Sequence, residues 1–209
     1  VFIMKSIICI GREYGSGGRE IGEKLSTELG IPCYDKLLIK KAALESGLSE
    51  EFISKADESP INSIQFLSGN PYSDMAGIGN TFYSESQQAY NAEKAVIEQI
   101  AGQGPCVIIG RCAPAIIPKD KRISLFIYAD KEDKVKRVMK RNQLTEKEAA
   151  HRIKHIDRMR KQFFEFYADT AWAEPESYDF MLSSSKFGID GCVKMIMESI
   201  KELEAHENE

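Results

Sequence analysis

Apolar residues follow two patterns along this chain of 209 residues. In short runs, β-branched and other apolar side chains stand next to one another, which is typical of strands covered on both faces. Elsewhere they recur every three or four positions, which predicts amphipathic helices. The runs predict strands at 7–10, 31–35, 106–109, 123–128 and 179–182. The periodic segments predict helices at 20–29, 36–45, 50–57, 84–101, 131–142, 146–167 and around 189–200.

The alternation of strands and helices predicts the fold class. It implies a parallel sheet with helices on both sides, so we expect an α/β fold with a five-stranded parallel sheet. A length of 209 residues with 43% hydrophobic content suits one domain with insertions, residues 1–209, better than two independent domains. Residues 59–80 are rich in Gly, Asn and Ser, so we expect a loop there.

One stretch combines a strand, a glycine cluster and a helix. The apolar run 7–10 leads into residues 15–18, which read Gly-Ser-Gly-Gly, and a helical pattern ended by Gly30 follows directly. Glycines allow positive φ, so successive N–H groups can point at one anion, and the helix adds its positive N-terminal end. A plain glycine turn is the alternative interpretation. Because the cluster lies between a strand and an amphipathic helix, we favour a phosphate-binding loop.

The glycine cluster departs from the common phosphate-loop motif G-x-x-x-x-G-K-[ST]. Gly17 takes the place of the second glycine, but Gly18 stands where the motif has lysine, and Arg19 and Glu20 follow. The fit to the motif is therefore incomplete.

Charge is distributed unevenly along the chain, whose formal net charge is −4. Residues 131–161 hold twelve Lys and Arg against five Asp and Glu, whereas residues 162–209 hold three against eleven. We predict two basic helices, the first with Asp130 as its N-cap and the second begun by a capping box of Thr145 and Glu148. Joined by a turn at Gln143 and Leu144, they form a hairpin that can fold over a bound anion. Because the chain is acidic overall and aromatics do not alternate with the basic residues, we favour a compact polyanion over nucleic acid. An exposed helix with many salt bridges is the alternative for most of the lysines.

Two candidate site residues come at the ends of predicted strands. Asp35 ends the second strand, and Arg111 follows the third strand after Gly110. Open α/β sheets bind ligands at the carboxyl ends of their strands, so both residues are candidates for binding. An arginine after a strand is commonly a surface residue, which is the alternative for Arg111.

Neither the cysteines nor the histidines form a convincing metal-binding pattern. The five cysteines are scattered without a C-x-x-C pair, so we expect reduced core residues of a cytoplasmic protein. His151 and His155 are spaced to share a helix face and could bind a metal, but we expect a solvated face instead. No apolar run is long enough to span a membrane, and we expect no signal peptide.

Taken in order, the glycine cluster, Gly110-Arg111 and the paired basic helices resemble the cytidylate kinase-like branch of the nucleoside monophosphate kinases, over nearly the whole chain. The residues that carry this resemblance are 12–19, 107–111, 157–160 and the aromatic run 163–167. The resemblance implies a P-loop kinase fold with a helical lid at about residues 131–161 and acceptor binding within residues 57–83. It also implies ATP and Mg²⁺ as cofactors and small-molecule nucleotides as substrates.

The resemblance assigns roles to individual residues. In the family's pattern the loop binds the phosphates of ATP, the arginine of the Gly-Arg pair holds the acceptor's phosphate, and an Asp-x-x-Arg pair on the lid contacts the acceptor and the transferring phosphate. The implied catalytic residues are Arg19, Arg111, Asp157 and Arg160. The implied ATP-binding residues are Gly15, Ser16, Gly17, Gly18, Arg19, Glu20, Arg137 and Arg141. The implied acceptor-binding residues are Asp35, Arg111 and Arg158.

Cytidylate kinases carry lysine, then glycine, then a hydroxyl residue where this chain has Gly18, Arg19 and Glu20. We expect Arg19 to replace the lysine, because it is the cation that can face a γ-phosphate from the first turn of the helix. Arg12 is the next choice. Ser16 or Glu20 would replace the hydroxyl that binds Mg²⁺.

The first hypothesis for the function is ATP-dependent phosphoryl transfer to CMP or dCMP. One alternative is a nucleotide-binding module without transfer activity, for which the missing lysine is the argument. Another is a P-loop kinase for a different acceptor, such as an antibiotic or a sugar alcohol. The arginine-rich lid favours an active kinase. We further expect a cytoplasmic monomer or weak homo-oligomer that binds neither nucleic acid nor a membrane.

Overall fold

The computed structural model describes residues 6–35 and 76–206, together with positions 38, 41, 44, 45 and 47 between them. The predicted helix at 50–57 and residues 57–75 of the predicted acceptor-binding passage lie outside the described residues, as does most of the predicted helix at 36–45.

A five-stranded sheet forms the centre of the molecule, and all of its neighbouring strands are parallel. Along the sheet the strands stand in the order β2-β3-β1-β4-β5. Their bounds are β1 (Ile7–Arg12), β2 (Cys33–Tyr34), β3 (Val107–Ile109), β4 (Arg122–Tyr128) and β5 (Phe180–Ser183). The predicted parallel sheet is therefore confirmed, with each strand within a few residues of its predicted position.

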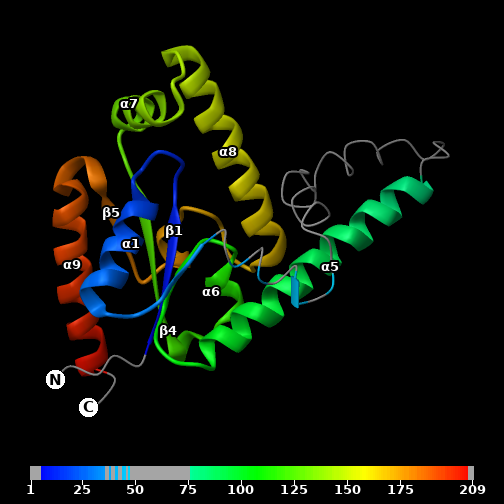
Figure 1. The fold of residues 1–209 in the computed structure, drawn as a ribbon, viewed down its shortest axis with the longest axis horizontal. Helices are drawn as coiled ribbons and strands as arrows, with labels where there is room; N and C mark the ends of the chain where they lie inside the picture. Colours follow the sequence, from blue (N-terminus) through cyan, green and yellow to red (C-terminus); the bar gives the residue numbers. More distant parts are fainter. Residues whose placement is uncertain are drawn as a thin grey trace.

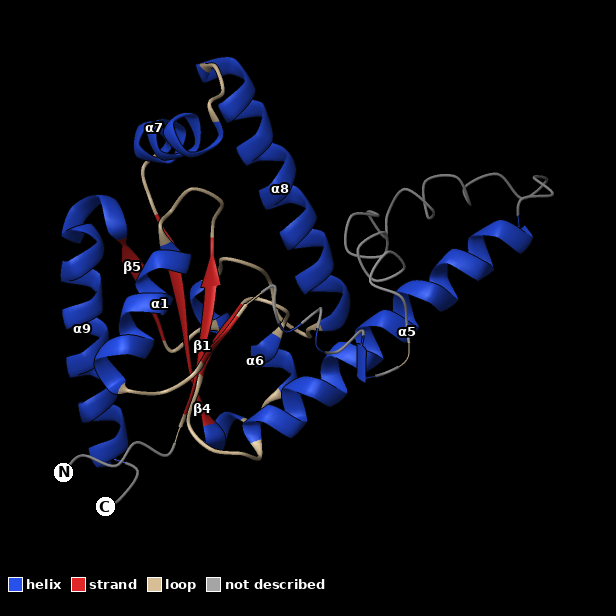
Figure 2. Cartoon of the chain, in the orientation of Figure 1, coloured by secondary structure: helices blue, strands red, loops and turns tan. Residues whose placement is uncertain are grey.

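Helices cover both faces of the sheet, and two more stand beyond its carboxyl edge (Figure 1). Their bounds are α1 (Gly18–Leu29), α5 (Ala76–Ala101), α6 (Ala113–Ile116), α7 (Lys131–Asn142), α8 (Glu146–Tyr167) and α9 (Ser184–His206). Figure 2 shows α1 and α9 on one side of the strands and α5 and α6 on the other. The arrow of β1 points toward α7 and α8, so these two helices lie at the end of the sheet where ligands are expected.

The alternation of side chains along β1 explains why both faces are covered. Ile8 and Ile10 join a buried cluster with residues of α1 and α9, whereas Ile7 and Cys9 join a second cluster with residues of α5 and α6. Successive side chains of a strand point to opposite faces, so an uninterrupted apolar run needs a helical layer on each side. The five cysteines are all free, and four of them are buried.

Helix α5 corrects one prediction. It begins at Ala76, whereas the sequence predicts a loop through residue 80 and a helix from residue 84. Its C-terminal half is anchored by buried Val96, Ile97 and Ile100. Once a helix is nucleated, each further residue adds one hydrogen bond, so α5 extends through glycines that would not start a helix alone.

Helices α7 and α8, which form a hairpin, begin at the residues predicted for them. Thr145 and Glu148 form the predicted capping box, in which the Glu148 carboxylate accepts from the Thr145 N–H at 2.8 Å. Asp130 occupies the predicted N-cap position of α7, but its side chain makes no capping hydrogen bond, which corrects that detail. The final helix is longer than predicted and is kinked at Gly188, where φ is 67°.

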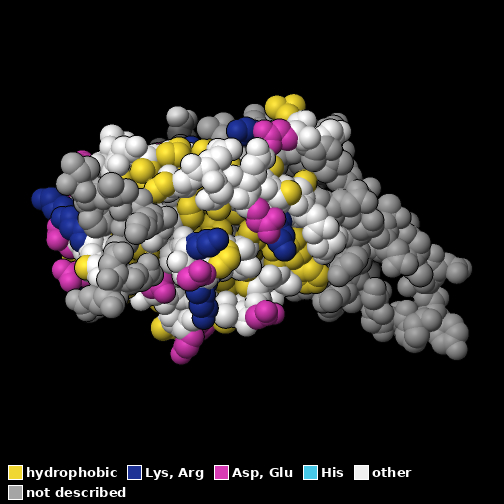
Figure 3. Space-filling model, turned by 90° about the horizontal axis from the view of Figure 1, so that it is seen from below, with side chains coloured by type: hydrophobic (Ala, Val, Ile, Leu, Met, Phe, Trp, Pro, Cys, Tyr) yellow, Lys and Arg dark blue, Asp and Glu magenta, His cyan; other side chains and the backbone are white. Residues whose placement is uncertain are grey.

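Among the described residues, the face at the amino ends of the strands shows no concentration of one charge. Seen from below in Figure 3, Lys and Arg side chains alternate with Asp and Glu among apolar patches. Within the described ranges, no helix is both long and apolar enough to cross a membrane.

Candidate functional site

The predicted strand, glycine loop and helix are confirmed at the carboxyl end of β1. Gly15 and Gly17 have φ values of 85° and 83°, and Gly17 caps α1. A Cβ atom on Gly15 would lie 2.9 Å from the backbone oxygen of Lys134, so the loop passes α7 too closely for a side chain there. Glycine is thus required at this position both by its φ angle and by the available space.

The loop is held internally by Ser16, which is completely buried. Its hydroxyl donates to the Glu13 carbonyl at 2.9 Å and accepts from the Gly18 N–H at 3.4 Å. The Ser184 hydroxyl, at the start of α9, donates to the Ser16 carbonyl at 2.5 Å. The Ser16 hydroxyl therefore stabilises the loop and is not exposed to a metal ion.

The α7–α8 hairpin, which contains the predicted lid, rests directly on the loop. The Tyr14 N–H donates to the Asp157 carboxylate at 2.6 Å, and the Lys134 ammonium lies 3.0 Å from the Glu13 carboxylate. Arg137 donates to the Gly15 carbonyl at 3.3 Å. The predicted ATP-binding residue Arg137 and the predicted lid residue Asp157 thus meet at the glycine loop.

Asp157 sits among groups with opposing effects on its pKa. Burial raises the pKa of its carboxyl group to about 6, although the Tyr14 N–H and the charges of Arg160 and Lys134 act to lower it. The Arg160 guanidinium lies 3.8 Å from Asp157 and donates to the Arg12 carbonyl at 3.0 Å. The predicted lid pair therefore contacts the backbone of the segment before the glycine loop at two points, the Tyr14 N–H and the Arg12 carbonyl.

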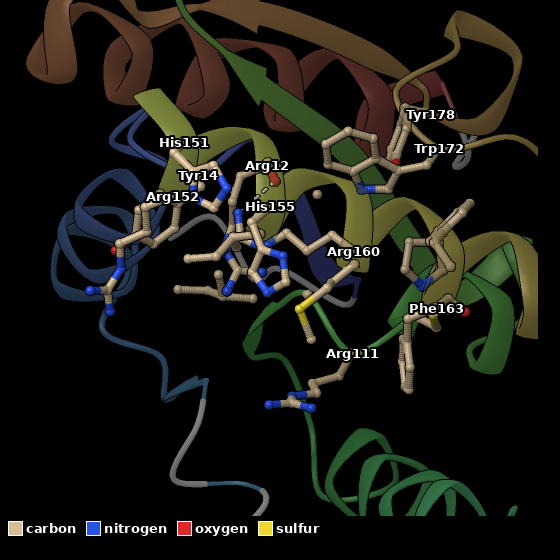
Figure 4. A pocket seen from close by; sticks show the side chains of 18 of the residues that line it. Arg12, Tyr14, Arg111, His151, Arg152, His155, Arg160, Phe163, Trp172 and Tyr178 are labelled. Carbon is tan, nitrogen blue, oxygen red and sulfur yellow. Dashed lines mark hydrogen bonds between the residues drawn. The ribbon is translucent and has the colours of Figure 1, made fainter. Parts of the chain in front are cut away.

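A cavity of about 1030 Å³ lies between α8 and the carboxyl ends of β1 and β3. Figure 4 shows that the two sides of the cavity differ. One side carries basic residues, Arg12, Arg152 and Arg160, and the other carries aromatic residues, Phe163, Trp172 and Tyr178. Arg111 lines the cavity from the turn after β3. Glu148 is the one carboxylate among the described lining residues. The cavity thus combines a basic side, suited to phosphate, with an aromatic side, suited to a planar ring.

Arg111 lines this cavity at the turn after β3, and its side chain is largely buried, unlike that of a surface residue. Only 12% of its side chain is exposed, and its guanidinium lies 3.3 Å from the carboxylate of Glu93 on α5. Arg111 and Cys112 both have positive φ, 58° and 52°, so the chain turns sharply after Gly110. Glu93 was not predicted as a site residue from the sequence. It lies on the helix face that also carries Val96 and Ile100, and a carboxylate on an apolar face could have indicated a buried ion pair.

Arg12, the last residue of β1, reaches the same cavity. Burial is the main cause that lowers the pKa of its guanidinium well below the usual value, and the charges of Arg160 and Arg111 add to this. His151 and His155 are both exposed, as predicted, and they also line the cavity.

Several predicted site residues lie outside the cavity lining. Arg19 pairs with Glu23 at 2.8 Å and with Asp35 at 3.1 Å, and the Glu23 hydrogen bond is the main cause that raises the pKa of Arg19. The guanidinium carbon of Arg141 lies 4.8 Å from the centre of the Tyr14 ring. Arg158 is exposed and lies near His155.

The described residues offer no ready-made magnesium site. No group of three His, Cys, Asp or Glu side chains among them could hold a metal ion. Glu20 is exposed and lies 3.8 Å from Lys24, and the Ser16 hydroxyl is enclosed in the loop. Magnesium in phosphoryl-transfer enzymes is often bound mainly through substrate phosphates and water, and that mode fits these residues better than a protein cage.

Comparisons with known proteins agree with this architecture. Residues 7–186 match the cytidylate kinase-like family. The chain is similar to the crystal structure of an uncharacterized protein from Eubacterium ventriosum, with 29% identity, 94% of this chain and 99% of that chain covered, and a TM-score of 0.71. No curated protein matches the chain.

Two shikimate kinases share the fold at low identity. The enzyme from Bacteroides thetaiotaomicron is 11% identical, with 94% of this chain and 98% of that chain covered and a TM-score of 0.50. The enzyme from Acinetobacter baumannii, in complex with shikimate, is 12% identical, with coverages of 95% and 94% and a TM-score of 0.50. The sheet and its helices thus form a P-loop kinase fold.

Proposed function

The chain belongs to the cytidylate kinase-like family, and from this premise we propose that it transfers the γ-phosphoryl group of ATP to the phosphate of CMP or dCMP. The kinase class rests on the family and the fold together. The choice of a cytidine nucleotide rests on the family alone.

The observation that carries the proposal is the convergence of arginines on one cavity. Arg12 comes from β1, Arg111 from the turn after β3, and Arg160 from α8. Positive charges held close together in a partly buried site repel each other, and an anion bound among them offsets this repulsion. One phosphate group would not need three arginines from three elements, so we infer that two phosphate-bearing ligands meet here.

The proposed binding roles follow from the position of each group. The glycine loop, residues 15–18, and the N-terminus of α1 bind the phosphates of ATP, with Arg137 and Arg141 beside them. Arg111 binds the phosphate of the acceptor, and Asp157 and Arg160 hold the lid against the loop. The aromatic side of the cavity receives the flat base of the acceptor.

The proposed transfer needs no general base from the protein. The bond between the γ-phosphorus and the β,γ-bridging oxygen breaks, and that oxygen leaves with ADP. A new bond forms from the γ-phosphorus to an ionised phosphate oxygen of the acceptor, which carries no proton to remove. Mg²⁺ supplies charge neutralisation on the phosphates, and the protein supplies positioning and further positive charge.

Acceptor-dependent release of ADP tests the proposal. ATP, Mg²⁺ and the protein are incubated with CMP, dCMP, UMP, AMP, GMP or shikimate in turn, with a reaction without acceptor as the baseline. We expect ADP release above the baseline with CMP or dCMP. Release with shikimate alone would indicate a kinase for a non-nucleotide acceptor. ATP binding without acceptor-dependent release would indicate an inactive nucleotide-binding module.

A further inference from the structure

Arg12 differs from the other basic residues around the glycine loop. Its backbone carbonyl accepts from Arg160, but its guanidinium has no hydrogen bond or ion pair to any residue in the described part of the chain. Arg12 lines the same cavity as Arg111 and Arg160, as Figure 4 shows. A cation in this setting has its hydrogen-bonding capacity available for an anionic ligand.

Two glycines make room for this side chain. A Cβ atom on Gly18 would lie 2.8 Å from Cβ of Arg12, and one on Gly110 would lie 2.1 Å from its Nη1. The stem of Arg12 therefore passes over Gly18, and its head passes over Gly110. Any side chain at either position would displace Arg12.

Gly18 is also the position at which the common phosphate-loop motif carries its lysine. Because Arg12 occupies the space next to Gly18, a lysine at position 18 and Arg12 in its present place exclude each other. The absence of a lysine at position 18 is therefore compatible with, and required by, the present position of the Arg12 side chain.

Arg19, the replacement expected from the sequence, is less well placed for this role. Its guanidinium already contacts Glu23 and Asp35, and 58% of the side chain is exposed. It does not line the cavity. To reach a phosphate there, Arg19 would have to give up two carboxylate partners.

We propose that Arg12 takes over the role of the absent loop lysine and binds the γ-phosphate of ATP, including the phosphoryl group in transfer. This inference rests on the proposed function. Arg12 stays protonated and takes no part in bond formation. Its planar guanidinium can hold two phosphate oxygens at once, which a lysine ammonium cannot do in the same geometry. Because Arg12 lines the same cavity as Arg111 and Arg160, it can stay in contact with the phosphoryl group during transfer to the acceptor.

The first experiment compares nucleotides by titration calorimetry without any acceptor. In Arg12→Gln, we expect the affinity for a non-hydrolysable ATP analogue to fall on the order of 10-fold to 100-fold, since a charge-assisted contact is lost. The affinity for ADP should change much less, because ADP lacks the γ-phosphate. Lys201→Gln, on the exposed side of α9, is the matched control and should bind both nucleotides like the wild type. Equal losses for both nucleotides, or no loss, would overturn the inference.

The second experiment removes the Arg12 side chain and introduces the motif lysine at position 18, first separately and then together. Gly18→Lys alone should weaken binding of the ATP analogue, because the new side chain overlaps Arg12. The double variant Arg12→Gly with Gly18→Lys restores the motif lysine and should bind the analogue better than either single variant. Thermal melting shows that each variant is folded. A double variant no better than Arg12→Gly would contradict the inference.

The outcomes separate this inference from the proposed function. An active wild type whose Arg12→Gln variant keeps its activity and its preference for the ATP analogue over ADP leaves the function standing and overturns the role of Arg12. A wild type that shows no acceptor-dependent ADP release, but loses preference for the ATP analogue in Arg12→Gln, overturns the function and keeps the inference. A wild type that binds no nucleotide overturns both.

Discussion

Two sets of basic residues surround the glycine loop, and they differ in whether they line the cavity. The loop-holding set, Arg19, Lys134 and Arg137, lies outside the cavity lining and has protein partners at 2.8, 3.0 and 3.3 Å. The cavity set, Arg12, Arg111 and Arg160, lines one cavity, although Arg111 also pairs with Glu93 and Arg160 with Asp157. Lys134 and Arg137 contact the loop segment and stabilise it, whereas the cavity set is brought together at an electrostatic cost that an anion would relieve.

The pKa of Arg19 shifts in the opposite direction to the pKa values of Arg12 and Arg160. The hydrogen bond to Glu23 raises the pKa of Arg19. Burial lowers the pKa of Arg12 and of Arg160, and the charge of Arg111 lowers both further. Residues of one chemical type near one loop therefore serve different purposes, and their environment decides which.

The largest effect is expected in the cavity set. Arg111→Ala should lower kcat/KM for the acceptor by about 10²-fold to 10³-fold, because a charged contact to the acceptor's phosphate is lost in a buried site. ATP binding, measured by calorimetry, should remain within a few fold of the wild type.

Glu93→Gln is the matched variant for Arg111, because it keeps the size of the Arg111 partner and removes its charge. We expect a smaller loss of kcat/KM than in Arg111→Ala. If Arg111→Ala weakens ATP and acceptor binding equally, Arg111 is a structural residue and the division into two sets fails at this position.

The next effect concerns the loop that the first set holds. Gly15→Ala should lower the free energy of unfolding by about 2–3 kcal/mol, because the residue has positive φ and the new Cβ meets the Lys134 carbonyl. Gly30→Ala is the control, since Gly30 also has positive φ but nothing lies within 4 Å of its Cβ position. Its cost should be about 1–2 kcal/mol. Equal costs in urea unfolding would show that the approach of α7 to the loop does not constrain Gly15.

A third prediction concerns Asp157, which joins the lid to the loop. Its pKa is raised to about 6, so the native state holds the proton more tightly than the unfolded chain. Stability from this group is present at low pH and is lost as the pH rises from about 4 to 6, by about 3 kcal/mol. Glu13, Lys134, Arg160 and the Tyr14 N–H face this carboxyl group. In Asp157→Asn this loss should disappear from unfolding curves taken across that pH range, and an unchanged pH profile would show that another group is responsible.

The smallest effect is expected at Arg19. Arg19 does not line the cavity, and its guanidinium contacts Glu23 and Asp35. Arg19→Gln should therefore change the preference for the ATP analogue over ADP far less than Arg12→Gln does, as measured by the same calorimetry. A larger effect at Arg19 would restore the hypothesis derived from the sequence and reverse the assignment of these two arginines.

The fold was predictable from the sequence because its signals are local. Directly adjacent apolar residues marked β1, β3 and β4, and the hairpin of α7 and α8 was marked by periodicity and by the capping box at Thr145. The start of α5 was not predictable in this way. Residues 76–80 are helical because buried residues some twenty positions later nucleate the helix.

The site was predictable only in part. Arg111 could be placed because it follows a buried strand, and the same reasoning applies to Arg12, which ends β1. The glycine cluster drew attention to Arg19 instead. Its i,i+4 spacing to Glu23 on α1 could have indicated that pair, but the contact with Asp35 joins segments that the sequence does not bring together. Which charges pair and which remain available depends on contacts between distant segments, and spacing along the chain does not encode these contacts.

The central claim is that a phosphoryl group passes between two ligands in one cavity, and label transfer tests it most directly. The protein is incubated with Mg²⁺, ATP labelled in the γ-phosphate, and CMP, and the products are separated. We predict label in the β-phosphate of CDP, formed in equal amount to ADP. Label that stays in ATP, or that appears only as inorganic phosphate at the same rate with and without CMP, would contradict the claim.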